Sequence, residues 1–390
     1  MGLYSKRLSW AATPNRIAEL AAEKKRLGVP LLDLTVSNPT EAISDYPHES
    51  IRQAYCGMRD FRYRPDPLGD KRARQAIAAY YRQRSIEVSP DRLILTASTS
   101  EAYTLLFKLL CDPGEEVLTP VPSYPLFEYL AAMECIGIAP YQLAYDGSWF
   151  IDFEQLRKQI SARSKAIVVV NPNNPTGSVL KVGETAELLA LAEERNLPVI
   201  SDEVFMDYPL QISAGRVKSL IGTDSVLSFT LNGLSKAAGM PQMKLGWIAI
   251  NGPEREADQA RERLELLSDS FLSVATPVQE ALRELLKIGS LVQKSLTAQI
   301  AQNFESLSAL AGSPANALYM EGGWSAILQV PRIQPEEAFV LQLLQEQDVL
   351  VQPGYFFDMP SEGYVVVSLI TPPRAFSEGI DRLKVLLTRH

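Results

Sequence analysis

Residues 166–177 read Ala166-Ile167-Val168-Val169-Val170-Asn171-Pro172-Asn173-Asn174-Pro175-Thr176-Gly177, an apolar run followed by a segment with two prolines. A short apolar run bounded by turn-forming residues is typical of a strand that is buried on both faces. Proline fixes φ and lacks an amide hydrogen, so neither a helix nor a central strand can continue through residues 171–177. The sequence therefore predicts a buried strand that ends in a rigid loop rich in amide groups.

This strand and loop belong to a series that extends from about residue 90 to residue 250. Short β-rich runs alternate there with stretches that place apolar residues at helical spacing, the pattern of βα units in a mostly parallel sheet. The expected strands are 92–96, 116–119, 166–170, 199–202, 226–230 and 245–250, and the expected helices are 100–110, 124–133 and 184–195. This part of the chain is predicted to be an α/β domain.

Beyond Pro277 the sequence changes character. Long amphipathic helical patterns continue to about residue 311, followed by an expected strand at 324–330, a helix at 336–347 and a strand at 364–369. The N-terminal segment before residue 46 is too short to bury a core of its own, so we expect it to pack against this C-terminal part. The predicted organisation is a large α/β domain at residues 46–280 and a smaller α+β domain formed by residues 1–45 and 281–390.

The composition is that of an ordinary globular protein. The chain has 390 residues, of which 46% are hydrophobic and 22% are charged, which is enough material for two cores. A net charge of −8 leaves no basic surplus for binding nucleic acid or an anionic membrane. No apolar run approaches the roughly 20 residues that span a bilayer, and residues 1–10 lack the apolar core of a secretory signal. We therefore expect a soluble, cytoplasmic protein without nucleic-acid or membrane partners.

Histidine and cysteine are scarce in the chain. There are two histidines and three cysteines, and the cysteines fall in no CxxC or metal-ligand spacing. This scarcity argues against a histidine-dependent triad and against a multi-histidine metal site, so we expect no metal. We expect Cys56, Cys111 and Cys135 to be buried apolar residues.

Two charged residues follow expected strands. In open α/β sheets, ligands lie beyond the carboxyl ends of the strands. Asp202 stands at the tip of one apolar strand, where an unpaired carboxylate is costly, so it needs a cationic partner. Lys236 follows the 226–230 strand within a loop of small residues. Taken alone, a surface position is the simpler interpretation of this lysine.

Residues 97–101, Ala97-Ser98-Thr99-Ser100-Glu101, open an expected helix after the first strand. Hydroxyl groups and free backbone N–H groups at a helix N-terminus can hold a phosphate, although a serine or threonine before a helix is, taken alone, more often a plain N-cap. The combination is more informative than any part. A phosphate cradle, a loop amide, a buried acid and a lysine on successive strand ends can together hold an aldehyde cofactor with a phosphate group and a pyridinium nitrogen.

Three segments carry a resemblance to a known family. They are NPNNPTG at 171–177, SDEVF at 201–205 and LSKAAGMPQMKLGW at 234–247, in this order and spacing. With them the chain resembles the class I and II aminotransferases, which are pyridoxal 5′-phosphate (PLP) enzymes of fold type I, from residue 32 to the C-terminal helix. The resemblance implies a mostly parallel central sheet in a large PLP-binding domain, a smaller α+β domain, and amino transfer between an amino acid and a 2-oxo acid.

The resemblance also implies a role for each matching residue. Lys236 would form a Schiff base with the cofactor and later shuttle a proton, which requires a neutral amine and a pKa below its usual value of about 10.4. Asp202 would pair with the ring nitrogen, Asn174 would donate to the ring oxygen O3′, and Tyr124 would stack on the ring. The residues expected to hold the phosphate are Ser98, Thr99, Ser100, Lys244 and Tyr63.

Tyr63 is expected to act from a second subunit, because in the family a tyrosine reaches the phosphate across the dimer interface. This expectation makes a homodimer part of the prediction. The spacing from Tyr63 to Gly69 is one residue longer than the family usually has. The alternative is that Tyr63 packs locally as an ordinary half-buried aromatic residue.

Several positions depart from the family's pattern. Phe205 stands where a tyrosine often provides a second donor to O3′, and Gly233 stands where a serine is often found. Lys244 replaces an arginine that usually grips the phosphate, and lysine lacks the bidentate fork of arginine. Cofactor binding is expected to survive these changes.

The largest departure concerns the substrate. The family usually has an arginine in an Arg-x-Ser arrangement in the C-terminal strand, where it binds the substrate carboxylate with two hydrogen bonds. Val366 occupies that place here. Arg374 is the nearest arginine and could replace it from a loop, although an exposed surface position is the simpler interpretation. The sequence does not identify the amino acid or the oxo acid.

Other functions are compatible with parts of the pattern. A PLP-dependent carbon–sulfur lyase, which performs β- or γ-elimination, uses the same scaffold and is the main alternative. A ligand sensor fused to a DNA-binding module is disfavoured because no basic helix-turn-helix segment precedes the shared region. A dinucleotide-dependent dehydrogenase is disfavoured because no G-x-G-x-x-G follows a strand.

Overall fold

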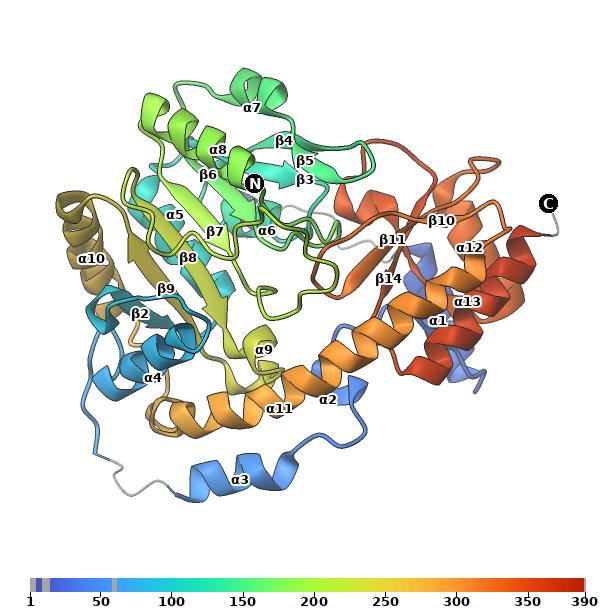
Figure 1. Ribbon diagram of the computed structural model, residues 1–390, viewed down its shortest axis with the longest axis horizontal. Coiled ribbons are helices and arrows are strands. Elements are labelled where there is room, and N and C mark those ends of the chain that lie inside the picture. Colours follow the sequence, from blue (N-terminus) through green and yellow to red (C-terminus); the bar gives the residue numbers. More distant parts are fainter. Residues whose placement is uncertain (1–4, 9–14, 58–61, 389–390) are drawn as a thin grey trace.

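The computed structural model describes residues 5–8, 15–57 and 62–388. Its largest sheet has eight strands in the order β2-β9-β8-β7-β6-β3-β4-β5 (Figure 1). The central strands β8, β7, β6, β3 and β4 run parallel, whereas β9 is antiparallel to both of its neighbours and β5 is antiparallel to β4. The strands are β2 (Leu93–Thr96), β3 (Glu116–Val121), β4 (Gly137–Tyr145), β5 (Trp149–Ile151), β6 (Ser164–Val170), β7 (Val199–Asp202), β8 (Ser228–Gly233) and β9 (Gly246–Asn251). The predicted mostly parallel α/β sheet is confirmed.

The six expected strands of this sheet correspond to β2, β3, β6, β7, β8 and β9. The sequence did not predict β4 or β5. β4 contains Gly137 and Pro140, which are typical of turns, and its burial alternates because it lies near the edge of the sheet. Its pairing with the buried strand β3 determines its conformation, and this long-range contact leaves no local signal.

Helices cover both faces of the sheet (Figure 1). Val168 of β6 packs on one face with α5 (Thr99–Leu110) and α10 (Glu254–Asp269), while the next residue, Val169, packs on the other face with α8 (Val182–Arg195). The expected helix at 124–133 begins only at Phe127, as α6 (Phe127–Met133). The other helices of this region are α2 (Pro39–Ala42), α3 (His48–Cys56), α4 (Lys71–Arg82), α7 (Phe153–Gln159) and α9 (Leu234–Ala237).

A second, antiparallel sheet has the order β10-β11-β14-β13. Its strands are β10 (Asn316–Ala317), β11 (Ser325–Gln329), β13 (Gln352–Pro353) and β14 (Tyr364–Ser368), and α12 (Glu336–Gln347) and α13 (Pro373–Leu387) lie beside it (Figure 1). The N-terminal helix α1 (Arg16–Arg26) contacts α12, and β1 (Leu32–Asp33) pairs with β12 (Val349–Leu350). Residues 16–33 and the C-terminal helix α13 therefore pack around this smaller sheet, whereas Arg7 donates to the carbonyl of Met133 in α6 of the large domain.

One long helix, α11 (Thr276–Ser306), runs from the large sheet to the smaller one (Figure 1). It passes so close to α9 that a Cβ atom on Gly289 would lie 2.5 Å from Cβ of Ala238. Farther along, Gln299 donates to the carbonyl of Ile370 at 2.6 Å. The predicted domain boundary at residue 280 falls inside this helix, and the division into domains stays a prediction.

The expected burial of the cysteines is wrong for two of the three. Cys56 and Cys135 are exposed and Cys111 is partly buried. Cys56 is the last residue of α3 and Cys135 lies in the turn after α6, where the chain leaves the core. In the part of the chain that the structure describes, no helix is long and apolar enough to cross a membrane.

Candidate active site

Asp202 is the last residue of β7 and lies at the carboxyl end of the parallel strands. Its Oδ1 accepts the backbone N–H of Val204 at 3.2 Å, and its Oδ2 accepts the hydroxyl of Tyr103 at 3.0 Å. Burial raises the pKa of Asp202 to about 6, and the Val204 N–H, the Tyr103 hydroxyl and the charge of Lys236 oppose that rise. The charge of Lys236 thus acts on Asp202, but no ion pair joins the two side chains within the described residues, so the cationic partner expected for Asp202 stays a prediction.

Lys236 follows β8, the strand that pairs with β7, and lies in the single turn of α9. Burial lowers the pKa of its amine, against the opposing charge of Asp202. This is the direction that a neutral lysine requires. Its Nζ lies 5.1 Å from the ring centroid of Trp324, a buried residue just before β11.

Side chains from separate elements hold the main chain around Lys236. The hydroxyl of Tyr208, which follows β7, donates to the Lys236 carbonyl at 2.6 Å. Gln293 of α11 donates to the carbonyl of Ala237, and Tyr46, just before α3, donates to that of Gly239 at 2.9 Å. A one-turn helix leaves carbonyl groups without intrahelical partners, and these donors satisfy them. The turn that carries the lysine is therefore fixed at several points.

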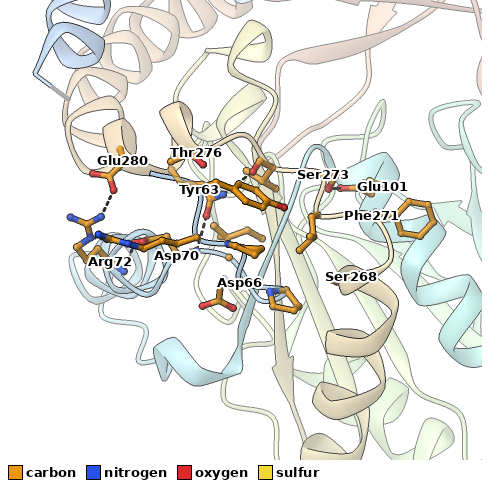
Figure 2. A pocket seen from close by; sticks show the side chains of 18 of the residues that line it. Tyr63, Asp66, Asp70, Arg72, Glu101, Ser268, Phe271, Ser273, Thr276 and Glu280 are labelled. Atoms are coloured by element: carbon orange, nitrogen blue, oxygen red, sulfur yellow. Dashed lines mark hydrogen bonds and ion pairs between the residues drawn. The ribbon is translucent and has the colours of Figure 1, made fainter. Parts of the chain in front are cut away.

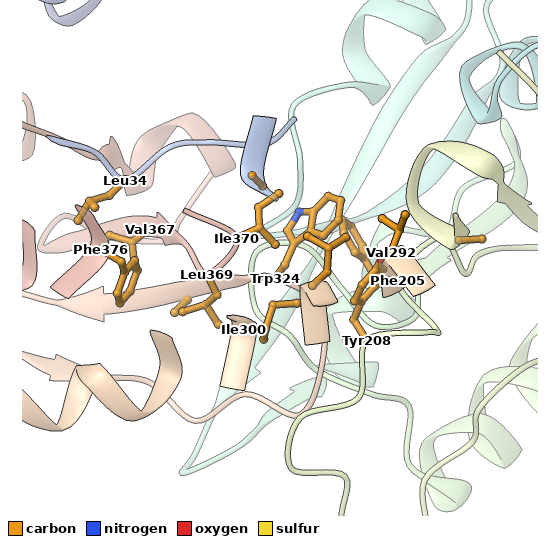
Figure 3. Packing of buried hydrophobic residues seen from close by; sticks show 14 of the residues in the cluster. Leu34, Phe205, Tyr208, Val292, Ile300, Trp324, Val367, Leu369, Ile370 and Phe376 are labelled. Atoms are coloured by element: carbon orange, nitrogen blue, oxygen red, sulfur yellow. The ribbon is translucent and has the colours of Figure 1, made fainter. Parts of the chain in front are cut away.

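Two aromatic residues stand next to this turn. Phe205 is buried and packs against Trp324 with 5.0 Å between ring centroids, so the position that often holds a tyrosine has an apolar contact instead. Tyr208 lies 5.3 Å from the same indole, and its hydroxyl points to the lysine backbone. Figure 3 shows Trp324 close to Phe205 and Tyr208 within the buried cluster.

Ser98, Thr99 and Ser100 lie together at the start of α5, as expected. The Ser98 hydroxyl accepts the N–H of Glu101 at 3.1 Å, and the Glu101 carboxylate accepts the N–H of Ala97 at 2.5 Å. Ser98 is thus an N-cap residue. The first backbone N–H groups of the helix and the hydroxyls of Thr99 and Ser100 can bind an anion.

The start of β9 packs closely beside this helix end. A Cβ atom on Gly246 would lie 3.1 Å from the backbone of Ser98, and one on Gly233 would lie 3.0 Å from Gly246. This spacing explains why glycine replaces the usual serine at position 233, since a longer side chain would meet the neighbouring strand. Lys244 lies two residues before the start of β9, in the left-handed conformation with φ of 49°, and is exposed.

Asn174 lies in the loop after β6, and Tyr124 lies in the loop after β3. The neighbouring Asn173 secures the first loop, because its Oδ1 accepts the hydroxyl of Thr176 at 2.9 Å. Asn174 Oδ1 is buried and has no hydrogen-bond partner within the described ranges. Tyr124 is 52% exposed, which leaves much of its ring open to contact.

Tyr63 lies apart from these residues and is 73% exposed. It lines a pocket between residues 62–72 and 268–280, together with the exposed Phe271 (Figure 2). The pocket borders the first turn of α5 through Glu101, whose carboxylate also accepts the hydroxyl of Ser273 at 2.7 Å. Lys236 and Asp202 are not among the residues that line it.

The two residues considered for substrate binding lie in different surroundings. Val366 is buried in β14 opposite Ile327, in an apolar cluster that also contains Phe357. Arg374 is exposed in the first turn of α13.

Three residues close to the site were not predicted from the sequence: Tyr103, Tyr208 and Trp324. Tyr103 follows Thr99 by four residues and so lies on the same face of α5, which was a usable signal. Tyr208 lies six residues beyond Asp202, in the segment that connects β7 to β8. No sequence motif around Trp324 indicated that it lies near the site.

These groups fit a phosphorylated aldehyde with a basic ring nitrogen. Lys236 can bond to the aldehyde, Asp202 can pair with the ring nitrogen, and the side-chain N–H groups of Asn174 can donate to a ring oxygen. The N-terminus of α5 suits a phosphate. The fold and this set of groups define a PLP enzyme of fold type I.

Comparison with known proteins gives the family. The model of aminotransferase class I and II matches residues 29–374. The chain is 27% identical to the glutamate-pyruvate aminotransferase of Haemophilus influenzae, over 93% of this chain and 91% of the relative. It is 30% identical to the alanine aminotransferase of Mycobacterium bovis, over 94% of this chain and 86% of the relative. The structure of alanine aminotransferase from Pyrococcus furiosus has a TM-score of 0.86 at 28% identity and covers 99% of this chain and 100% of that one.

The chain belongs to the class I and II aminotransferases. PLP is the cofactor of this family, and the chemistry is transfer of an amino group between an amino acid and a 2-oxo acid. Because these relatives are named as aminotransferases, the alternative of a carbon–sulfur lyase is not favoured.

Proposed function

We propose that Lys236 is the residue that bonds to PLP in this aminotransferase and that Asp202, Asn174 and Tyr124 bind the ring. The observation that carries the proposal is that Asp202 and Lys236 lie at the ends of the neighbouring strands β7 and β8, where the charge of each acts on the other. Burial raises the pKa of Asp202 and lowers the pKa of Lys236, so it favours the neutral form of both groups. The charge of each group opposes the shift of the other. Amino transfer needs such a pair: a carboxylate that is ionised beside a cationic ring and a lysine that can lose its proton.

The roles of the residues follow from these positions. When bound, the cofactor supplies an electron-withdrawing ring that stabilises negative charge at the substrate Cα. Lys236 Nζ takes the proton from Cα and returns one during the transfer, and burial favours the neutral amine that this step requires. Tyr208 and Gln293 hold the main chain of Lys236 and Ala237 while the side chain moves.

The phosphate is proposed to lie at the start of α5. Thr99, Ser100 and the free N–H groups of this twelve-residue helix are the donors, while the Ser98 side chain caps the helix. Lys244 adds positive charge from the loop before β9. It does so as a point charge, without the two parallel hydrogen bonds that an arginine would make.

The first substrates to test are glutamate, alanine and pyruvate, because the relatives are named for them. Val366 excludes a carboxylate-binding arginine at its own position, so another group binds the substrate carboxylate. Arg374 is the candidate from this chain, since its exposure leaves it available.

A homodimer is part of the proposal, with Tyr63 of one subunit contributing to the phosphate site of the other. The exposure of Tyr63 and Phe271 beside the first turn of α5 supports it. A cytoplasmic location remains a prediction from the sequence.

A panel of amino acids tests the proposed reaction. Purified holoenzyme is mixed with each amino acid without an oxo acid, and the cofactor absorbance is followed. Conversion to the pyridoxamine form with release of the matching 2-oxo acid supports amino transfer. Release of pyruvate and ammonia from cysteine or serine, without the pyridoxamine form, would contradict it.

A further inference from the structure

Tyr103 brings a single polar atom into an apolar part of the large domain. The residue is fully buried, and its ring packs against Phe107 and Phe127 with centroid distances of 5.8 and 5.3 Å. Its hydroxyl donates to Asp202 Oδ2 at 3.0 Å. A phenylalanine would fill the same space, so the hydroxyl is the only part of this side chain that acts on Asp202.

Among the described residues, each oxygen of Asp202 has one donor. Oδ1 accepts from the N–H of Val204 and Oδ2 accepts from Tyr103. Two donors on different oxygens fix the plane of a carboxylate, and each ionised oxygen keeps a further acceptor site. The carboxylate is thus held in one orientation with acceptor sites left over for the cofactor.

Tyr103 acts as a donor throughout the neutral range. Burial, followed by the charge of Asp202, raises the pKa of its phenol well above the usual value. A hydrogen bond to the charged form of an acid stabilises that form. Tyr103 therefore opposes the effect of burial, which favours a neutral Asp202.

We propose that Tyr103 is a positioning residue that holds Asp202 ionised and correctly oriented toward the ring nitrogen of the cofactor. This inference rests on the proposed role of Asp202. It also couples the two ends of the cofactor site, because Tyr103 and the phosphate donors Thr99 and Ser100 belong to the same helix.

The variant Tyr103→Phe removes the hydroxyl and keeps the ring. The matched control is Tyr141→Phe, because Tyr141 is equally buried and its hydroxyl donates only to the backbone carbonyl of Val168, at 2.8 Å. Both variants lose one buried hydrogen bond, but only the first removes a donor from a carboxylate. Asp202→Asn and the double variant Tyr103→Phe/Asp202→Asn complete the set.

The first measurement uses the full chain without cofactor and follows its melting temperature between pH 4 and pH 8. The folded-state pKa of Asp202, about 6, lies above its ordinary value, so its stability contribution is present at low pH and is lost as the pH rises through 6. Removing the Tyr103 hydroxyl raises this pKa further. The stability deficit of Tyr103→Phe is therefore expected to grow as the pH rises.

Two other charged groups act in the same region. Lys236 opposes the protonation of Asp202, and the neighbouring Glu203, whose pKa burial raises to about 7, titrates in the same range. The Asp202→Asn background separates these effects, because Lys236 and Glu203 are unchanged in it. The pH-dependent part of the Tyr103→Phe deficit is expected to disappear there, and Tyr141→Phe is expected to show a deficit that does not vary with pH.

The second measurement uses the holoenzyme and follows exchange of the substrate Cα proton with solvent. Tyr103→Phe is expected to slow exchange roughly tenfold to a hundredfold, the scale of a hydrogen bond to a charged group, and Tyr141→Phe much less. A pH-independent deficit in Tyr103→Phe, or exchange as fast as in Tyr141→Phe, would overturn the inference. Near wild-type exchange in Asp202→Asn would instead refute the proposed role of Asp202, and the two failures are thereby distinguished.

Discussion

The surroundings of Lys236 and those of Tyr63 differ in burial and in the hydrogen bonds that hold them. Around Lys236, the polar groups are buried and receive hydrogen bonds from separate elements, including Tyr208 and Gln293. Around Tyr63, the side chains face outward, and Tyr63 and Phe271 are 73% and 57% exposed. Groups that move protons require fixed positions and low solvent exposure, which the ends of central strands provide. Groups supplied to a neighbouring subunit must remain exposed in the single chain.

Lys236→Ala is the most severe test of the inner region. Turnover is expected to be abolished, together with the yellow absorbance of bound cofactor that borohydride fixes to the protein. Mass spectrometry of the reduced wild-type enzyme is expected to locate the modification on Lys236. The control is Lys181→Ala, which removes a partly buried lysine bonded to the carbonyl of Trp149 and is expected to keep both properties. A reducible cofactor in Lys236→Ala would identify another lysine as the attachment site.

Asp202→Asn tests the same region with a smaller expected effect. The neutral amide cannot hold the ring nitrogen protonated, so removal of the Cα proton is expected to slow by about a hundredfold or more while the cofactor stays bound. Each factor of ten corresponds to about 1.4 kcal/mol of barrier. Single-turnover kinetics with an α-deuterated substrate measure the step directly.

The matched control for Asp202→Asn is Glu203→Gln. Glu203 is the adjacent buried carboxyl, but it binds the hydroxyl of Ser201 and the N–H of Leu220. Its loss is expected to affect stability more than the rate of proton removal. Equal rates in the two variants would refute the special role of Asp202.

Tyr63→Phe tests the outer region and is expected to have the smallest effect. Loss of a hydrogen bond to a charged acceptor is expected to weaken cofactor retention by about 1 to 3 kcal/mol. Equilibrium dialysis or spectroscopic titration of the apoenzyme with PLP measures the change. An unchanged affinity would favour the alternative that Tyr63 packs locally.

Mixing Tyr63→Phe with Lys236→Ala subunits tests whether Tyr63 acts across an interface. A heterodimer of the two has one site with both defects and, if the tyrosine acts in trans, one intact site. At a PLP concentration that limits the Tyr63→Phe enzyme, activity is expected to recover to as much as about half of the wild-type value per heterodimer, because each site works with locally placed groups. No recovery after verified subunit exchange, or a fully active monomer, would remove the shared site.

The sequence predicted the parts of the site that short motifs encode. Asp202 and Lys236 each follow an apolar strand, and the alternation of strands and helices places both at one edge of the sheet. Their partners are different. Tyr103 is 99 residues from Asp202 in the sequence, and Gln293 is 56 residues from Ala237. The helical spacing from Thr99 indicates the face of α5 on which Tyr103 lies, but which residue each side chain contacts depends on how the elements pack.

The strand β4 and the exposed cysteines are further features that the sequence did not predict because they depend on tertiary contacts. The alternation of β4 depends on its place near a sheet edge, and the exposure of Cys56 and Cys135 depends on where helices end. In each case the local composition was compatible with more than one environment. The tertiary contacts decided between them.

The helix α11 limits which segments of this enzyme can be exchanged independently with those of a relative. Gln293 and Gln299 lie six residues apart on one helix, about 9 Å at 1.5 Å per residue, and they bind the chain beside Lys236 and the chain just after β14. A rigid helix keeps these two attachment points at a constant separation. Exchanging β14 and its loop for those of a relative with a different substrate would therefore also shift the backbone of the turn that carries Lys236, unless the matching part of α11 were exchanged with them.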